Sequence, residues 1–174
     1  TDCALKQGAR LVYAVDVGYG QLAWELRNDH RVVVLERTNI RYLTRDAFRE
    51  IPDFVTIDVS FISLDKVLPV LNGLMSGEAA GVALIKPQFE AGREKVGKKG
   101  VVRDPQVHLE VIEKLVRLFL EQGWSVKGLD FSPVTGPEGN IEYLLHFQRD
   151  DCPKTCVCPL PVVQRAHAEL KGNF

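Results

Sequence analysis

Residues 81 to 90 read G-V-A-L-I-K-P-Q-F-E, an apolar run that ends in a charged residue followed by a proline. Such a short and nearly continuous apolar run is typical of a strand that is buried on both faces of a parallel sheet. Runs of the same kind cover residues 11–16, 31–35 and 53–58. Because helix-length segments separate these runs, the sequence predicts an α/β fold built on a mostly parallel sheet.

The segments around these runs predict helices at about residues 20–28, 44–50 and 63–74, and a longer helix at 105–121. Asp104 is placed to cap the long helix, and Pro105 would take its first position. The apolar stripe of this helix consists of Val107, Val111, Leu115, Leu118 and Phe119.

The end of the chain follows a different pattern. Residues 124–130 and 141–147 read as strands, but the segment between them is rich in proline and glycine and leaves no room for a helix. We therefore expect an antiparallel hairpin, with a last helix at about 160–171. A parallel series that ends in such a hairpin is the layout of the methyltransferase variant of the doubly wound fold. A nicotinamide dehydrogenase more often continues with another crossover helix.

The composition of the 174 residues excludes some classes of protein and leaves others open. A net charge of -1 gives no overall attraction to nucleic acid, so RNA binding would need a local basic patch. No apolar run approaches the roughly 18 residues of a membrane helix, so we expect a cytoplasmic protein without a membrane partner. The spacing of Cys152, Cys156 and Cys158 matches no usual zinc motif, so we expect reduced surface thiols and no metal.

Charged residues stand where the predicted strands end. Asp16, Asp58 and Lys86 each follow an apolar run, and Glu142 stands at the beginning of the last strand. Ligands in open α/β sheets bind beyond the carboxyl ends of the parallel strands. Because an antiparallel strand begins at that same edge, we expect Asp58, Lys86 and Glu142 to converge there. The alternative is that each is an isolated strand-end charge that faces water.

A basic stretch follows Lys86 along the chain. Residues 91–103 carry three glycines and five cations, which are Arg93, Lys95, Lys98, Lys99 and Arg103. A flexible cationic segment beside the reactive edge is suited to contact with a phosphate backbone. The alternative is a solvated charged loop.

The stretch V-D-V-G-Y-G-Q-L, residues 15–22, permits a second interpretation as a glycine-rich loop that binds a dinucleotide. Glu36 then stands at the spacing of the acidic residue of an NAD-type oxidoreductase. The third glycine of that motif is missing, however. Residues 1–8 also read as the end of a helix closed by Gly8, so an earlier strand is expected and the chain would be N-terminally incomplete.

Six stretches together resemble one family. They are V-Y-A-V-D-V-G-Y-G-Q-L, L-E-R-T-N-I-R-Y-L, T-I-D-V-S-F-I-S-L, L-I-K-P-Q-F-E-A-G-R, G-V-V-R-D and G-P-E-G-N-I-E-Y-L-L. These motifs resemble the haemolysin A-like (TlyA) family of FtsJ-like RNA ribose methyltransferases, from Thr1 to about Phe147. The resemblance implies a Rossmann-like methyltransferase domain over residues 1–150, followed by a C-terminal extension over 151–174.

The same resemblance implies S-adenosylmethionine as methyl donor and a ribose 2′-hydroxyl of ribosomal RNA, free or in a ribosomal subunit, as acceptor. It implies a Lys-Asp-Lys-Glu catalytic set, of which T-I-D-V-S supplies Asp58, I-K-P supplies Lys86 and G-N-I-E supplies Glu142. The first lysine, the glycine-rich turn after the first strand and an S4-type RNA-binding domain would belong upstream of Thr1. The residues implied for cofactor binding are Asp16, which would accept the ribose hydroxyls, Glu36 and Asn39 near the adenosine, and Asp58.

The chemistry agrees with these residue types. A ribose hydroxyl is a poor nucleophile, so a base must take its proton as it attacks the methyl carbon, and Lys86 is the candidate. A neighbouring cation, such as the sulfonium of the donor, would favour a neutral lysine, whereas two carboxylates act in the opposite direction.

The family's name suggests a different class, a membrane-active haemolysin. The chain has no spanning segment and no strongly amphipathic basic helix to support it.

Overall fold

The computed structural model describes residues 1–170, apart from the side chain of Lys98. The chain forms two compact units, Thr1–Ile51 and Pro52 onward. In the first unit, β1 (Val12–Val15) and β2 (Val32–Leu35) form a parallel pair. The helices of this unit are α1 (Asp2–Lys6) and α2 (Trp24–Arg27), and single 3-10 turns cover Ile40–Tyr42 and Arg45–Ala47.

The second unit holds a four-stranded sheet with the order β3-β4-β6-β5. Strands β3 (Phe54–Ile57) and β4 (Ala80–Ile85) are parallel. Strand β6 (Tyr143–Arg149) inserts antiparallel between β4 and β5 (Trp124–Phe131). The helices are α3 (Leu68–Leu74), α4 (Pro87–Glu90), α5 (Pro105–Glu121) and α6 (Pro159–Glu169). The sheet is therefore mixed, as a parallel series that ends in an antiparallel hairpin predicts.

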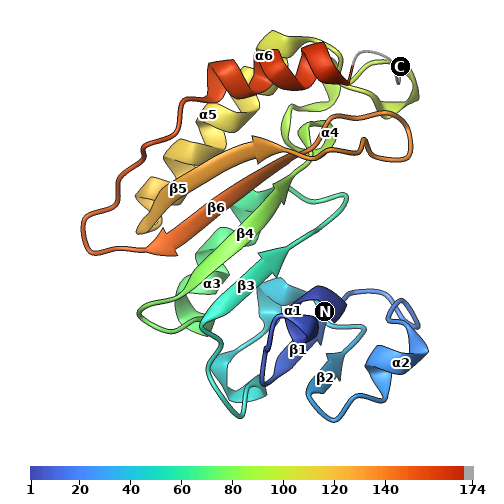
Figure 1. Cartoon of the computed structure of the whole chain (residues 1–174), viewed down its shortest axis with the longest axis vertical. Coiled ribbons are helices and arrows are strands. Elements are labelled where there is room, and N and C mark those ends of the chain that lie inside the picture. Colours follow the sequence, from blue (N-terminus) through green and yellow to red (C-terminus); the bar gives the residue numbers. More distant parts are fainter. Residues whose placement is uncertain (171–174) are drawn as a thin grey trace. The chain divides into compact units, whose positions relative to one another are not determined.

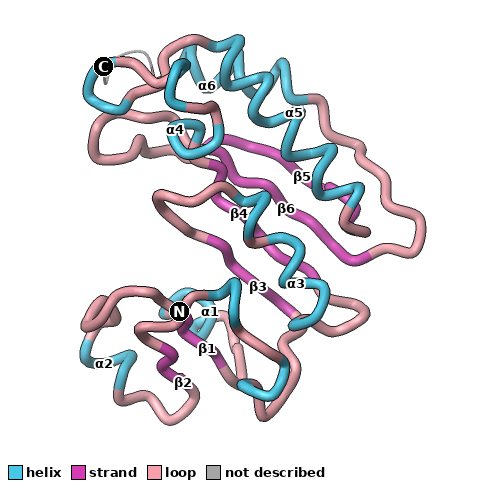
Figure 2. Tube along the Cα trace, turned by 180° about the vertical axis from the view of Figure 1, so that it is seen from behind, coloured by secondary structure: helices cyan, strands magenta, loops and turns pink. Residues whose placement is uncertain are grey.

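Helices α3, α5 and α6 lie on the same side of the four-stranded sheet, as Figures 1 and 2 show from opposite directions. Alternate residues of β6 are accordingly buried and exposed, with Tyr143, Leu145 and Phe147 pointing into the core. The prediction that the strands are buried on both faces is wrong for β3 and β4 within the described residues. The exposed side chain of Phe54 and the alternation along β4 show that only one face is covered.

Helix α5 begins at the residue that the sequence predicts, because the Asp104 carboxylate accepts a hydrogen bond from Gln106 N at 2.9 Å. Its buried stripe is rotated slightly from the predicted one. Val107 and Leu118 are only half-buried, and His108, Ile112 and Val116 take part in the core instead. Helix α6, which packs against α5 and β5, makes this wider stripe necessary.

A close approach between strands explains one glycine. A Cβ atom added at Gly81 would lie 2.5 Å from Val55 O on β3 and 2.6 Å from the ring of Phe147 on β6. Phe147 is the partner of Gly81 in the β4–β6 register. An aromatic ring thus fills the space that the missing side chain leaves.

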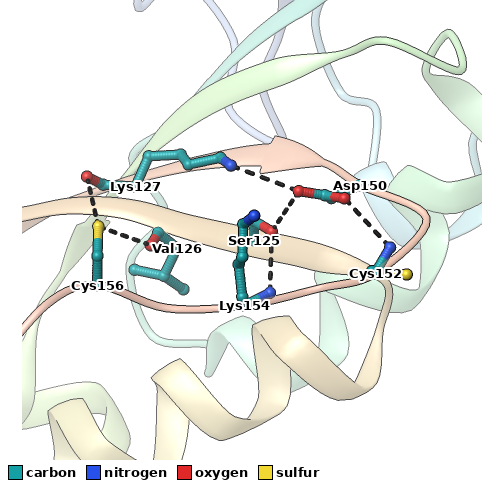
Figure 3. Close-up of polar contacts among 7 residues, drawn as sticks. All are labelled: Ser125, Val126, Lys127, Asp150, Cys152, Lys154 and Cys156. Atoms are coloured by element: carbon teal, nitrogen blue, oxygen red, sulfur yellow. Dashed lines mark hydrogen bonds and ion pairs between the residues drawn. The ribbon is translucent and has the colours of Figure 1, made fainter.

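The segment after β6 turns back along β5, as Figure 3 shows. Val126 N donates to Lys154 O at 3.0 Å, and Ser125 Oγ donates to the Asp150 carboxylate at 2.8 Å. The thiol of Cys156 lies 3.7 Å from Lys127 O, which it can reach as a weak donor. Cys152, Cys156 and Cys158 are free and exposed, as the sequence predicts for surface thiols.

The remaining helix predictions are partly right. The segment 63–74 is a 3-10 turn, Leu64–Lys66, followed by α3. The segment 20–28 contains only the short α2, and 44–50 contains one 3-10 turn in place of a helix. Both segments lie in the first unit, where few buried residues favour longer helices. The predicted end of the last helix, residue 171, lies outside the described residues.

Candidate active site

Two of the strand-end charges of the second unit are in direct contact. Lys86 Nζ lies 2.7 Å from an oxygen of Asp58 and donates to Ser60 Oγ at 3.0 Å. The lysine follows β4 and the aspartate follows the neighbouring parallel strand β3, so the two side chains meet at the carboxyl edge of the sheet. The lysine side chain is 13% exposed and the aspartate 69%, so the ion pair has one buried and one open side.

Glu142 belongs to the same cluster. Ile85 at the end of β4 pairs with Tyr143 at the start of β6, so the residues that flank this pair, Lys86 and Glu142, lie at the same edge. Burial raises the pKa of Glu142, and the negative charge of Asp58 adds to that rise. The charge of Lys86 and a hydrogen bond from Gln88 act in the opposite direction. The structure thus brings Asp58, Lys86 and Glu142 together, in the arrangement expected from the sequence.

The loop before Glu142 is tied to the basic stretch by Asn140, which is 4% exposed. Its side-chain oxygen accepts from Val102 N at 3.1 Å, and its amide donates to Gly100 O at 3.0 Å. Sequence reasoning missed this residue, although an asparagine in the glycine-rich segment G-P-E-G-N suggests a turn. It also missed Ser60 and Gln88, which stand inside the quoted motifs beside Asp58 and Lys86.

The basic stretch forms an irregular loop of short 3-10 turns before α5. A shallow hollow of about 450 Å³ is lined by residues that include Lys95, Lys99 and Arg103. Lys95 pairs with Glu110 of α5 at 2.6 Å, and the side chain of Arg93 is exposed. The remaining cation expected to bind RNA, Lys98, has a side chain outside the described part of the structure. The loop therefore presents several cations on one side of the second unit.

The residues expected to bind the cofactor lie in the first unit. Asp16 is exposed, and one of its oxygens accepts from Gly18 N at 2.6 Å. Its other carboxylate oxygen has no hydrogen bond among the described residues, which fits an acceptor for ribose hydroxyls. The Glu36 carboxylate accepts from Gly20 N at 2.9 Å and pairs with Arg27. Asn39 caps the 3-10 turn that follows it by accepting from Arg41 N.

These contacts distinguish between the two interpretations of the glycine-containing residues 15–22. The hydrogen bonds from Gly18 and Gly20 to carboxylates occupy backbone N–H groups that a dinucleotide pyrophosphate would need. The pairing of Glu36 with Arg27 lowers the pKa of Glu36 against the opposing effect of its burial, so this carboxylate stays ionised. These hydrogen bonds favour the interpretation in which the loop exposes the Asp16 carboxylate, and disfavour the one in which the loop binds phosphates.

Together, the mixed sheet, the carboxyl-edge cluster and the acidic residue after β1 define an α/β domain of the methyltransferase type. Residues 1–149 match the family described as FtsJ-like methyltransferase, and the chain belongs to that family. Among the described residues, no helix is long and apolar enough to cross a membrane.

Curated relatives are similar over most of this chain. A protein of Bacillus subtilis whose name describes an rRNA methyltransferase, YqxC, is 53% identical over 98% of this chain and 63% of its own length. The 16S/23S rRNA (cytidine-2′-O)-methyltransferase TlyA of Mycobacterium tuberculosis is 53% identical over 83% of this chain and 54% of its own length. The chain therefore spans a little more than half the length of these relatives.

Solved structures support the same fold. A protein titled as a hemolysin from Streptococcus thermophilus superposes with a TM-score of 0.95 at 48% identity, covering 99% of this chain and 63% of that protein. A protein titled as an S-adenosylmethionine-dependent methyltransferase from Listeria monocytogenes superposes with a TM-score of 0.61 at 15% identity. It covers 86% of this chain and 84% of that protein, and at this identity the likeness shows the fold alone.

Proposed function

We propose that this chain is the catalytic part of a methyltransferase that moves a methyl group from S-adenosylmethionine to a ribose 2′-hydroxyl of ribosomal RNA. The observation that carries the proposal is the contact between Lys86 and Asp58, with Glu142 beside them, at the carboxyl edge of an FtsJ-like sheet. A relative named as an rRNA (cytidine-2′-O)-methyltransferase supports the choice of substrate. The same proposal assigns residues 1–150 to the methyltransferase domain and residues 151–174 to a C-terminal extension. It also places the protein in the cytoplasm, where ribosomes are found.

Asp16, Glu36 and Asn39 would hold the cofactor, with Asp58 at the reacting end. The free oxygen of Asp16 would accept the ribose hydroxyls of the cofactor. Glu36 would act through the loop that it fixes, because Arg27 and Gly20 already occupy one of its oxygens. S-adenosylmethionine supplies an electrophilic methyl group when it is bound.

Lys86 is the base of the proposed reaction. In its neutral form, Nζ would take the proton of the ribose hydroxyl as the oxygen forms its bond to the methyl carbon, while the bond between that carbon and the sulfonium sulfur breaks and S-adenosylhomocysteine leaves. Asp58 and Ser60 hold Nζ in place by direct contacts, and Glu142 is close enough to orient the hydroxyl or the lysine. Such fixed geometry contributes to rate because the reacting atoms need no search for alignment.

The basic loop would contact the phosphate backbone through Arg93, Lys95, Lys98, Lys99 and Arg103. The two hydrogen bonds of Asn140 fix the backbone of this loop to the segment that leads to Glu142. Phosphate contacts position a nucleic acid without reading its sequence. The loop would thus align the RNA, and the cluster at the sheet edge would carry out the transfer.

The test is Lys86→Ala in the full-length protein. We expect methyl transfer to rRNA to fall by at least about a thousandfold, because the base is lost while the fold and cofactor site are kept. Transfer is measured with labelled S-adenosylmethionine, and cofactor affinity by calorimetric titration. Undiminished transfer would exclude Lys86 as the base.

Lys127→Ala is the matched control, since Lys127 also pairs with an aspartate, Asp150, at 3.4 Å in the same unit. Its removal should leave transfer unchanged. A comparable loss in both variants would indicate a general effect on folding and would contradict the assignment.

A further inference from the structure

A buried glutamate stands one helical turn after the reactive lysine. Glu90 is the last residue of α4, which begins directly after Lys86, and it is only 8% exposed. Its carboxylate accepts hydrogen bonds from Ser63 Oγ at 2.6 Å and from Leu64 N at 2.7 Å. Because Ser63 Oγ itself accepts from Asp65 N at 3.3 Å, its own proton is left for Glu90. Each oxygen of the buried carboxylate therefore has a donor.

The two donors belong to the segment that follows β3. Asp58 and Ser60, which contact the reactive lysine, stand earlier in the same segment. Glu90 stands in the segment that follows β4, so its hydrogen bonds join the ends of two neighbouring parallel strands. The rings of Phe61 and Phe89 add an apolar contact between these segments, with centroids 5.0 Å apart. The segments that carry the two sides of the ion pair are thus connected beyond the ion pair itself.

A buried carboxylate at this position costs free energy that an apolar side chain would not. Burial raises the pKa of Glu90, because desolvation disfavours the charged form, whereas the hydrogen bonds from Ser63 and Leu64 oppose the rise. An apolar side chain of similar volume would fill the same space, but its contacts have no preferred direction. Hydrogen bonds do have one. What the carboxylate adds to packing is therefore a fixed spacing between the two strand ends.

We propose that Glu90 is a positioning residue for methyl transfer, whose carboxylate holds the segment after β3 against the segment after β4 and so keeps Lys86 Nζ in contact with Asp58 and Ser60. In this role Glu90 touches neither the methyl donor nor the acceptor. The inference rests on the proposed function for its effect on rate. The hydrogen bonds of Glu90 and the contact between Lys86 and Asp58 can be tested without turnover.

The experiment compares Glu90→Gln and Glu90→Met with the wild type in the full-length protein. Glutamine keeps the shape, but its single oxygen can face only one of the two donors, and methionine removes both acceptors at similar volume. The amide proton of Leu64 is followed by NMR, and the distance from Lys86 Nζ to Asp58 is taken from crystal structures. Transfer to rRNA is measured with kcat separated from KM, and cofactor affinity by calorimetric titration.

We expect the Leu64 amide proton to move upfield and to exchange faster in both variants, and more with methionine, because its bond to a charged acceptor is weakened or lost. The distance from Lys86 Nζ to Asp58, 2.7 Å in the wild type, should exceed hydrogen-bond reach in Glu90→Met. At saturating RNA, kcat should fall about tenfold with glutamine and further with methionine. Cofactor affinity should stay unchanged.

Ser63→Ala tests the same link from the segment after β3. The substitution removes one donor to Glu90, so it should lower kcat in the wild-type background. In the Glu90→Met background it should cause little further loss, because that hydrogen bond is already absent. Should methionine prevent folding, the same comparison is made in the Glu90→Gln background.

Asp150→Asn is the matched control in the same unit. The Asp150 carboxylate also accepts from a serine hydroxyl, Ser125 Oγ at 2.8 Å, and from a backbone N–H, that of Cys152 at 3.1 Å. Asp150 follows β6, whereas Glu142 precedes that strand, so the control lies beyond the strand end opposite to the candidate site. Its substitution should leave kcat unchanged.

Additive losses of kcat from Ser63→Ala and Glu90→Met would overturn the inference, because the two side chains would then act independently. A lower melting temperature with an unchanged kcat in folded protein would also overturn it, since Glu90 would then contribute to packing alone. A loss confined to KM for RNA would contradict the assigned role in the same way. A wild type that transfers no methyl group would contradict the proposed function, while the distance from Lys86 to Asp58 in Glu90→Met still decides the positioning.

Discussion

The two units of this chain are stabilised in different ways. In the described residues, the unit up to Ile51 buries Leu5 and Val32 among its apolar side chains, whereas the second unit buries Trp124, Phe119, Phe147 and many aliphatic residues. The first unit depends more on polar contacts, such as the pairing of Arg27 with Glu36. Apolar burial contributes most of the free energy of folding, so the second unit should be the more stable one.

This difference matches the proposed roles. The residues assigned to cofactor binding stand on loops of the polar unit, where hydrogen bonds such as Gly18 N to Asp16 set the backbone. The residues assigned to the chemistry stand at strand ends of the well-packed unit. A reacting group needs a fixed position to a fraction of an ångström, which a packed core supplies. Substitutions in the two units and a change of pH should therefore have unequal effects on their stability.

The largest effect is expected for Phe147→Ala in the second unit. Phe147 is fully buried and packs against Phe119 and Trp124 at ring-centroid distances of 4.7 and 5.2 Å. Its removal should lower the free energy of unfolding by about 3–5 kcal/mol, measured by chemical denaturation. Val32→Ala in the first unit is the matched change and should cost roughly 1–2 kcal/mol, in keeping with its smaller side chain and sparser surroundings. Equal costs would contradict the comparison.

An intermediate effect on the free energy of unfolding is expected when the pH is lowered. His108 is buried, and its Nε2 must donate to Val102 O at 2.9 Å because a carbonyl only accepts. Its Nδ1 then accepts from the Tyr143 hydroxyl at 2.7 Å, and Nε2 of His167 lies 3.2 Å from the same nitrogen. The neutral ring therefore satisfies Val102 O and the Tyr143 hydroxyl. Burial lowers the pKa of His108 from 6.5 to about 4. Between these values the unfolded chain binds the proton and the folded chain does not, so stability is present above pH 6.5 and is lost as the pH falls toward 4.

Between pH 6.5 and 4, the free energy of unfolding should fall by about 3 kcal/mol at most. It is measured as the free energy of unfolding at a series of pH values. His108→Gln should flatten the curve between pH 4 and 6.5, after allowance for its lower stability. A curve of unchanged slope in this variant would show that another group is responsible.

The smallest effect is expected for Glu36→Gln in the first unit. The substitution keeps the shape but removes the charge that pairs with Arg27 and accepts from Gly20 N. We expect a small local loss of stability, because hydrogen bonds to a charged group are replaced by neutral ones. Hydrogen exchange should show faster exchange at the amides of β1, β2 and Gly20, with β4 and β6 unchanged. Faster exchange in both units to the same extent would mean that they unfold together.

Much of the architecture follows from local patterns. The apolar runs predict all six strands to within a few residues, and Asp104–Pro105 predicts where α5 begins. The hairpin is predicted because the proline- and glycine-rich segment after β5 cannot form a helix. The sequence overestimates the length of the helices in the first unit. Apolar periodicity alone does not stabilise a helix that has little to pack against.

In the candidate site, too, local sequence predicts some features and tertiary packing decides the others. Local sequence is enough to show which charges stand at strand ends, since Asp58, Lys86 and Glu142 border apolar runs where an unpaired charge would be costly. The tertiary structure alone shows that Lys86 contacts Asp58 and Ser60, and that Asn140 connects the basic loop to the segment that leads to Glu142. Strand periodicity is a local property of the chain. Contacts between residues 26 or more positions apart depend on register and packing, which no local pattern encodes.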